Sequence, residues 1–214
     1  MSSFPSRRPA ATIVRRAALV LLAAFAVAGC AGGPHPYDDA AGLSPRLIRT
    51  AYYDDGKALF VGLDVTAAVA VDAERTLPLA LVLADRGQAG AAFDRESFRL
   101  EDDRGQTFPL LSYEEFRALS RTTSLDRQAS QKFYEAAAQR LGPAAGGENP
   151  VIRAVPFFGV ETPRRDRLDL AAAEWARGML YFPRPDGELK GRVFSLLVRP
   201  VGAAETIVVK FRCS

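Results

Sequence analysis

The side chains that most often serve as nucleophiles, general bases or soft-metal ligands are scarce in this sequence. It contains two cysteines, Cys30 and Cys213, and one histidine, His35. A serine or cysteine nucleophile usually needs a general base, most often histidine, and neither a G-x-S-x-G nor an S-x-x-K pattern occurs. His35 lies in a Gly- and Pro-rich stretch that would not hold an imidazole rigidly. We therefore assign no catalytic residue.

Metal binding finds equally little support. Soft metals need several Cys, Met or His ligands, and calcium needs about six or more oxygen ligands. Three Asp-Asp pairs could donate oxygens, but none has EF-hand spacing. A hydrolase with two facing carboxylates stays open as an idea because acidic residues are plentiful. Glu101, Asp102 and Asp103 are more simply the solvated residues of a hairpin turn. The sequence predicts no metal site and no cofactor.

The arrangement before Cys30 is the most specific pattern in the chain. Two arginine pairs, Arg7-Arg8 and Arg15-Arg16, precede an apolar run of 13 residues, Ala17–Gly29. A membrane-spanning helix needs roughly 20 residues, and a core helix should have a polar face, which this run lacks. A basic head, a short apolar stretch and small residues before a cleavage point are typical of a secretory signal.

Val27-Ala28-Gly29-Cys30 resembles the lipobox of bacterial lipoproteins. The resemblance implies that residues 1–29 are a signal peptide removed by cleavage, and that the Cys30 thiol is acylated and anchors the chain in a membrane. An ordinary secretory signal with an accidental cysteine is the alternative. By resemblance to enterobacterial lipoproteins, Ala31 after the acylated cysteine implies sorting to the outer membrane, facing the periplasm; retention in the inner membrane is the less favoured outcome.

Removal of the signal would change the charge balance. Residues 1–29 hold four of the 28 basic residues and none of the 25 acidic ones, which leaves a net charge of −1. The pI of about 9.0 for the whole chain therefore does not indicate a nucleic-acid partner. Residues 30–44 are expected to be a flexible tether, since Ala31–Pro36 carry Gly and Pro without apolar content. Cys213 would then be the only other cysteine, either a free thiol or one half of an intermolecular disulfide.

Period-two alternation of apolar residues dominates the rest of the chain. It predicts a strand at Leu77–Ala84 that is buried on both faces, and several further strands: 58–64, 66–71, 97–101, 106–110, 151–159, 179–182, 192–199 and 206–212. Tyr113–Ser120 and Asp126–Leu141 read as helices, the second ended by Gly142-Pro143. Many short strands separated by turns indicate a sandwich or barrel. We expect residues 45–214 to form a mainly β domain, an antiparallel β-sandwich with a helical insertion at about 113–141.

Four consecutive segments add a resemblance to this pattern. Leu79–Leu83 is a hydrophobic strand, Asp85–Gly87 a glycine turn, Phe93–Leu100 a segment with an F-x-L strand, and Gly105–Phe108 a turn with an aromatic strand. In this order they resemble exported immunoglobulin-like sandwich domains of unknown function, which occur in many bacterial lipoproteins. The resemblance implies an immunoglobulin-like fold and carries no catalytic residue over.

Trp175 is expected in a connection between strands. It is a candidate ligand or partner contact, because tryptophan is enriched at interface hot spots, but capping one open end of the sandwich is the favoured role, because large aromatic side chains are usually mostly buried. We expect a membrane-anchored, non-catalytic lipoprotein that binds a protein or cell-envelope component in the periplasm, with 113–141 as the candidate contact surface. The second hypothesis is a small-ligand or carbohydrate binder that uses the end near Trp175. An envelope hydrolase is the least favoured.

Overall fold

The computed structural model describes residues 42–70, 75–86, 89–119, 128–142, 151–158 and 165–213. All of them belong to one compact unit, Pro36–Ser214. The lipobox Val27–Cys30, His35 and the tether up to residue 41 lie outside the described residues. Signal cleavage, acylation of Cys30 and the flexible tether therefore stay predictions.

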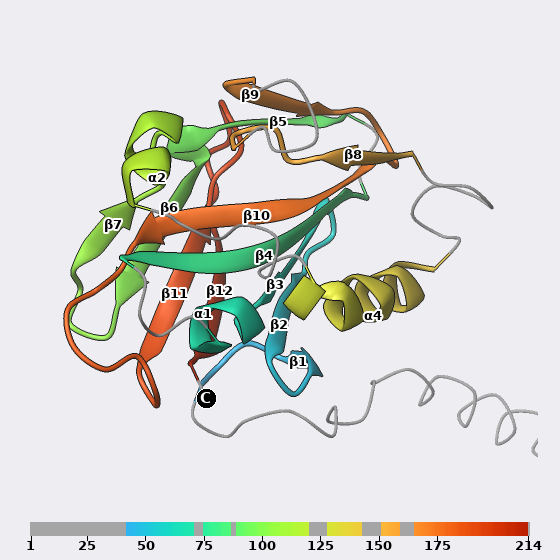
Figure 1. Cartoon of the computed structure of the whole chain (residues 1–214). Helices are drawn as coiled ribbons and strands as arrows, with labels where there is room; N and C mark the ends of the chain where they lie inside the picture. The colour runs from blue at the N-terminus through green and yellow to red at the C-terminus, as the bar shows by residue number, and fades with distance from the viewer. Residues whose placement is uncertain are drawn as a thin grey trace, which may run out of the picture. The chain divides into compact units, whose positions relative to one another are not determined.

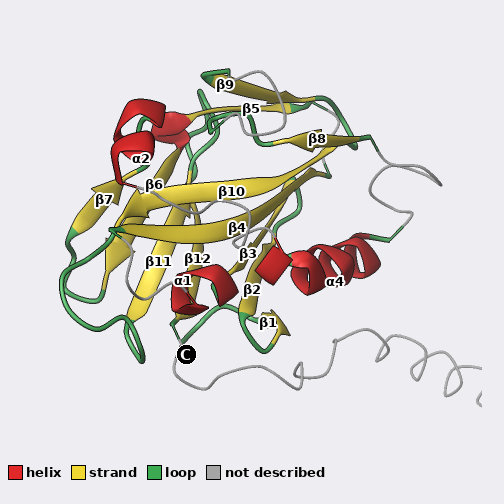
Figure 2. Cartoon of the chain, in the orientation of Figure 1, coloured by secondary structure: helices red, strands yellow, loops and turns green. Residues whose placement is uncertain are grey.

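The largest sheet contains six strands: β1 Arg46–Ile48, β2 Ala51–Asp55, β3 Leu59–Asp64, β4 Thr76–Asp85, β8 Ile152–Ala154 and β10 Trp175–Pro183. Their order is β1-β2-β3-β4-β10-β8 (Figures 1 and 2). Neighbouring strands are antiparallel, except that β8 pairs with β10 in parallel.

A second sheet has four antiparallel strands: β6 Phe98–Asp102, β7 Thr107–Pro109, β11 Val193–Val198 and β12 Ile207–Arg212. Their order is β12-β11-β6-β7. β5 Ala91–Asp94 and β9 Arg167–Leu170 form a separate antiparallel pair. A 3-10 turn, η1 Arg95–Ser97, joins β5 to β6. The C-terminal hairpin of β11 and β12 forms where the alternating pattern predicts it.

The two larger sheets pack face to face through alternate side chains. β12 contacts β2 and β3, and β7 contacts β10. The ring of Tyr52 on β2 lies 6.3 Å, centroid to centroid, from that of Phe211 on β12. Every residue of β4 is buried, which confirms the prediction that this strand is covered on both faces. Such a strand is apolar on both sides because each face has a packing partner.

Helices cover the face of β4 that does not pack against the four-stranded sheet. α1 Thr66–Ala70 and α4 Gln131–Leu141 both pack against β4. α4 buries Phe133, Ala137 and Leu141 on one side, and Gly62 on β3 leaves room for the ring of Phe133, since a Cβ there would lie 3.3 Å from it.

α2 Tyr113–Leu119 buries Phe116, whose ring centroid lies 4.2 Å from that of Tyr181. The two predicted helices are thus present over α2 and α4, while residues 120–127 lie outside the described part. Gly142, with φ +55°, caps α4 by donating its N–H to the carbonyl of Ala138, which confirms the predicted helix end.

One strand prediction was wrong. The segment 66–71 was expected to be a strand, yet Thr66–Ala70 is the helix α1. The cause is local, because Asp64 at the end of β3 accepts hydrogen bonds from the Thr66 N–H (3.3 Å) and hydroxyl (2.9 Å). A carboxylate that satisfies the first free amide favours a helix start. Ala67 and Ala68 then face the core.

The predicted fold class is correct at the coarser level. The protein is mainly β, with several antiparallel sheets and few helices. The parallel pair β8–β10 is a difference from a purely antiparallel sandwich, and it arises because the chain crosses over between these two strands. The predicted strand 151–159 is limited to Ile152–Ala154 within the described residues. The immunoglobulin-like topology stays a prediction.

Candidate interaction surface

The outward side of the four-stranded sheet is the candidate site. Its strands alternate between buried residues facing the core and half-buried or exposed residues facing outward. We call the outward set the outer face; it consists of Arg99, Glu101, Ser195, Leu197, Arg199, Val208 and Lys210. Cross-strand pairing places Leu197 beside both Arg99 and Val208. An apolar centre therefore has basic neighbours.

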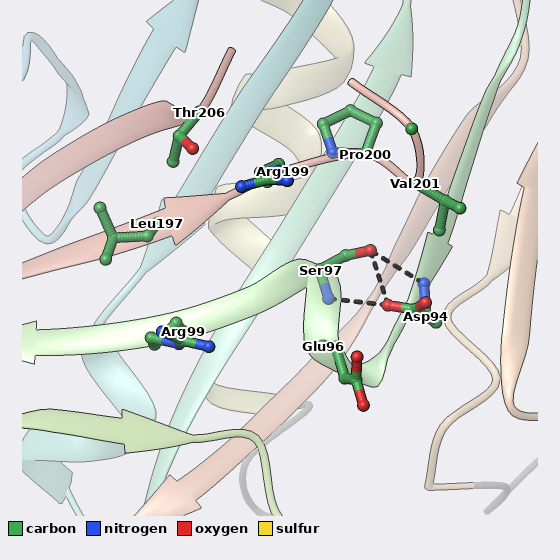
Figure 3. Close-up of a pocket in the computed structure, with 10 residues that line it drawn as sticks. Asp94, Glu96, Ser97, Arg99, Leu197, Arg199, Pro200, Val201 and Thr206 are labelled. Carbon is green, nitrogen blue, oxygen red and sulfur yellow. Dashed lines mark hydrogen bonds between the residues drawn. The ribbon is translucent and has the colours of Figure 1, made fainter. Parts of the chain in front are cut away.

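A depression of about 430 Å³ lies at one end of the outer face (Figure 3). It is lined by residues of β5, η1, β6, β11 and the following turn: Asp94, Glu96, Ser97, Arg99, Leu197, Arg199, Pro200, Val201, Gly202 and Thr206. The turn reverses at Gly202, whose φ of +76° suits glycine. The Ala203 N–H donates to the Pro200 carbonyl. This confirms the turn expected at residues 200–204.

The rim of the depression is fixed by a reciprocal cap. Asp94 Oδ1 accepts hydrogen bonds from the Ser97 N–H (2.8 Å) and hydroxyl (2.9 Å), and the Asp94 N–H donates to Ser97 Oγ (3.0 Å) (Figure 3). The Arg199 N–H donates to the Ser97 carbonyl, and the Val201 N–H to that of Ala92. The Ser97 residue is buried, and its hydroxyl is hydrogen-bonded to Asp94, so it is not placed to act as a nucleophile.

Arg99 and Arg199 bring two positive charges to the lining of the depression, and Asp94 and Glu96 bring two negative ones. No ion pair joins either guanidinium to another residue in the described part of the chain. Two large apolar side chains beside them, Val201 and Val208, are 46% and 44% exposed. Free guanidinium groups next to exposed apolar carbons can bind an acidic, partly apolar surface.

A smaller depression, about 320 Å³, lies toward the opposite end of the outer face and is lined in part by Glu101, Asp102 and Lys210. Asp102 differs from the solvated turn residue that the sequence suggested, because its side chain is 1% exposed. It accepts hydrogen bonds from the N–H groups of Arg104 and Gln106 and lies 2.7 Å from Arg192. Burial raises the pKa of Asp102. Those amides and the charges of Arg192 and Arg104 together lower it by more than burial raises it, so the pKa lies below its ordinary value.

Trp175 is the first residue of β10 rather than part of a connection between strands. It pairs with Ala84 on one side and Ile152 on the other. Its side chain is 5% exposed, so a ligand could touch little of the indole without displacing neighbours. The predicted contact role of Trp175 is untested, and the structure does not bring this residue to the outer face.

Cys213 directly follows β12 and is buried. Burial raises the pKa of its thiol to about 12, against a smaller lowering by Arg192 and Arg184. A buried, protonated thiol is a poor nucleophile. The intermolecular disulfide considered from the sequence would require the C-terminal end of β12 to open.

No group of three or more His, Cys, Asp or Glu side chains in the described ranges is arranged to hold a metal ion. Within the same part of the chain, no helix is both long and apolar enough to span a membrane.

The residues of the outer face were missed at the level of sequence. The signal that could have found them is the presence of Leu197 and Val208 at outward positions of strands that otherwise alternate apolar and polar. Such residues look like ordinary core residues until strand register is known. The convergence of Arg99 and Arg199, 100 positions apart, also depends on register that periodicity does not supply.

Comparisons with known proteins identify no family. No family model matches the chain, and no curated protein matches it. Among solved structures, the candidate lipoprotein ycdA of Bacillus subtilis strain 168 is similar, with 11% identity and a TM-score of 0.40 over 75% of this chain and 38% of that one. The yjhA protein of Bacillus subtilis is similar with 10% identity and a TM-score of 0.37, over 74% of this chain and 95% of that one. The chain thus spans well under half of ycdA, and likeness at this level carries no functional argument.

Proposed function

We propose that this protein is a membrane-anchored, non-catalytic lipoprotein of the outer membrane, facing the periplasm, which binds a protein or other envelope component through its outer face. The lipobox pattern ending at Cys30 supports the anchor. The observation that carries the binding role is the combination, on one sheet face, of apolar side chains with guanidinium groups that form no ion pair among the described residues.

The composition of the outer face is that of an interface core with a polar surround. Single exposed apolar residues are normal on a surface, but Leu197, Val201 and Val208 are gathered beside Arg99 and Arg199. Arginine is enriched at protein interfaces and aspartate and glutamate are depleted. Displacing water from these apolar carbons would add affinity, while the guanidinium groups would select an acidic partner.

A binding role also fits the side chains better than catalysis does. The Ser97 hydroxyl is held by Asp94, and Asp102 is held by Arg192. Neither group is available to accept or donate a proton to a bound molecule.

In vivo crosslinking followed by purification from membranes tests this proposal. Charge reversal of both guanidinium groups, Arg99→Glu with Arg199→Glu, should lower recovery of a stoichiometric envelope partner about tenfold, a typical loss for hot-spot arginines. Lys132→Glu on α4 is the matched charge reversal in the helical insertion and should leave recovery unchanged. Equal recovery with the double variant would contradict the role of the outer face, and loss with Lys132→Glu would assign contact to the insertion instead.

The anchor has its own test. Cys30→Ala should abolish incorporation of labelled palmitate and release the protein from the membrane fraction. A Cys213→Ala variant serves as the control, since Cys213 is buried, and should stay labelled. Membrane retention and labelling of Cys30→Ala would contradict the lipoprotein assignment without bearing on the outer face.

A small-ligand or carbohydrate binder is the second candidate. The depression of about 430 Å³ is within the range of ligand pockets, and its two guanidinium groups suit an anionic group. The ligand would then occupy the outer face rather than the buried Trp175. Titration with anionic envelope sugars, followed by tryptophan emission and by calorimetry, separates the two places: heat without an emission change indicates the depression, and an emission shift indicates Trp175.

A further inference from the structure

A second surface feature is a groove of about 510 Å³ that is lined by residues of β8, β9 and the segments next to them. The two strands come from different sheets. The groove is lined by Arg153, Ala154, Pro156, Arg165, Arg167, Leu168, Asp169, Leu170 and Ala171. It shares no residue with the outer face. Whether the groove can accept another strand depends on which backbone N–H and C=O groups of β8 and β9 are already hydrogen-bonded to neighbouring strands.

β8 is an edge strand with one free side. The Val151 carbonyl accepts from the Trp175 N–H (3.1 Å), and the Val155 N–H donates to the Arg177 carbonyl (2.9 Å). Successive residues of a strand direct their N–H and C=O groups to opposite edges. Since Val151 and Val155 face β10, Ile152 and Ala154 direct theirs away from it. All three residues of β8 are exposed.

β9 has a free side as well. It pairs with β5, where Ala92 lies opposite Asp169. The Ala92 carbonyl accepts from the Val201 N–H (2.8 Å) and therefore points away from β9. In an antiparallel ladder this makes Ala92 and Asp169 a non-hydrogen-bonded pair. The backbone groups of Asp169, and of Arg167 two residues earlier, are thus directed away from β5.

The two sides of the groove are fixed to each other at both ends. At one end the Glu174 carboxylate accepts from the Arg153 guanidinium (2.7 Å) and from the Ala171 N–H (2.9 Å). At the other end the Arg165 N–H donates to the Pro156 carbonyl (3.3 Å). The groove therefore lies between two short strand edges, and these hydrogen bonds hold the two edges in place relative to each other.

We infer that this groove accepts an extended segment of a partner protein, which adds as a strand to the free edges of β8 and β9. Main-chain hydrogen bonds supply the affinity in this mode of recognition, and alternate side chains supply the specificity. Of the three arginines that line the groove, Arg153 and Arg167 are paired with Glu174 and Asp169, and Arg165 adds a positive charge at the end near Pro156. The rest of the lining is apolar, namely Ala154, Pro156, Leu168, Leu170 and Ala171, and this favours a segment with apolar side chains at alternate positions.

The edges of the four-stranded sheet, β12 and β7, are protected, as edges of natural sheets usually are. On β12, the Ser44 N–H donates to the Lys210 carbonyl, and Ser44 Oγ accepts from the Lys210 N–H. β7 ends at Pro109, which has no N–H to donate. β8 is short, which limits uncontrolled pairing, and it lacks both of these devices.

The test uses the full acylated protein in detergent micelles as bait for a displayed library of short random peptides. Selected peptides should alternate apolar and polar residues, and their binding should fall about tenfold in Ala154→Pro, which removes one groove-facing donor and adds a steric block. Asp169→Pro should act alike on the opposite edge. Proline is tolerated at an edge where the N–H faces away from the sheet, and Ala154→Val keeps that N–H as the matched control.

Three outcomes would overturn the inference. The first is a selection that enriches no peptide. The second is enriched peptides whose binding is equal in Ala154→Pro, Asp169→Pro and the unaltered protein. The third is concentration-dependent self-association that Ala154→Pro abolishes, because the groove would then bind a second copy of this chain. Slower hydrogen exchange at Ile152 and Ala154 in the peptide complex confirms folding and placement together. None of these outcomes depends on the outer face.

Discussion

The guanidinium of Arg192 lies 2.7 Å from the carboxylate of Asp102, and both side chains are largely buried, at 16% and 1% exposure. The same guanidinium stacks over the ring of Phe194, 5.1 Å from its centroid, and donates to the Asp186 carbonyl (3.0 Å). Arg192 thus ties the β6–β7 hairpin to the start of β11 and to the loop before it. This ion pair supports one end of the outer face.

Removing one partner of the Arg192–Asp102 ion pair should lower the stability of the folded protein. Arg192→Ala leaves a buried carboxylate without its counter-ion, which is strongly destabilising, so thermal unfolding should occur at a clearly lower temperature. Arg167→Ala is the matched control, because its pair with Asp169 is exposed and such pairs contribute about 0–1 kcal/mol. Equal melting temperatures for the two variants would show that the buried pair adds nothing to stability.

The same pair predicts a pH dependence. The pKa of Asp102 is lowered in the folded protein, so its stabilising contribution is present above the unfolded-state pKa and is lost as pH falls through the folded-state pKa. The difference in unfolding free energy between the unaltered protein and Asp102→Asn should therefore shrink on acidification. Urea titrations at neutral and acid pH measure it, and a difference that grows in acid would reverse the sign we assign.

Cys213 should be inert while the protein is folded. Its side chain is fully buried, and its pKa is raised to about 12 by burial, so almost no thiolate exists at neutral pH. In a Cys30→Ala background, a thiol reagent should label Cys213 only after guanidinium unfolding, and a nonreducing gel should show monomer. Rapid labelling without denaturant, or a disulfide-linked dimer, would mean that the C-terminal strand opens readily.

Sequence pattern sufficed where a segment's own periodicity decides its structure. Leu77–Ala84 is apolar on both sides, and it is the strand that both layers cover. Gly142 ends α4 as expected because only glycine reaches its positive φ at little cost. At Thr66–Ala70 the pattern failed because Asp64, a residue outside the segment, starts a helix there.

The outer face and the groove could not be predicted from the sequence pattern, for a different reason. The outer face depends on the register that sets Leu197 beside Arg99, and the groove depends on which edges of β8 and β9 are already paired. Register and pairing are properties of contacts between distant segments. Trp175 illustrates the converse, since a residue type common at interfaces is here the first residue of a central strand, with its side chain buried.

Asp64 should destabilise the protein when it is ionised. It is 1% exposed; burial raises its pKa, against smaller lowering effects from Thr50, Thr66 and Ser130. A raised pKa means that its contribution is most favourable at low pH and is lost as pH rises through the folded-state pKa. Asp64→Asn keeps an acceptor for Thr66 and should raise the unfolding free energy at neutral pH, with the gain vanishing in acid. Glu135→Gln, on the exposed side of α4, is the control; a loss of stability in Asp64→Asn at neutral pH would contradict this.

The helices of the insertion should prove indispensable for folding. Phe133 of α4 is fully buried against Gly62, and Phe116 of α2 packs on Tyr181. Phe133→Ala should cost about 3–5 kcal/mol, as other buried Phe→Ala changes do, measured by urea unfolding, whereas Lys132→Ala beside it on the exposed side should cost under about 0.5 kcal/mol. Deletion of 113–141 should then give an unfolded chain by circular dichroism. A folded deletion variant would show that the six-stranded sheet needs no helical cover, and partner recovery with that variant would then test the insertion as a contact surface.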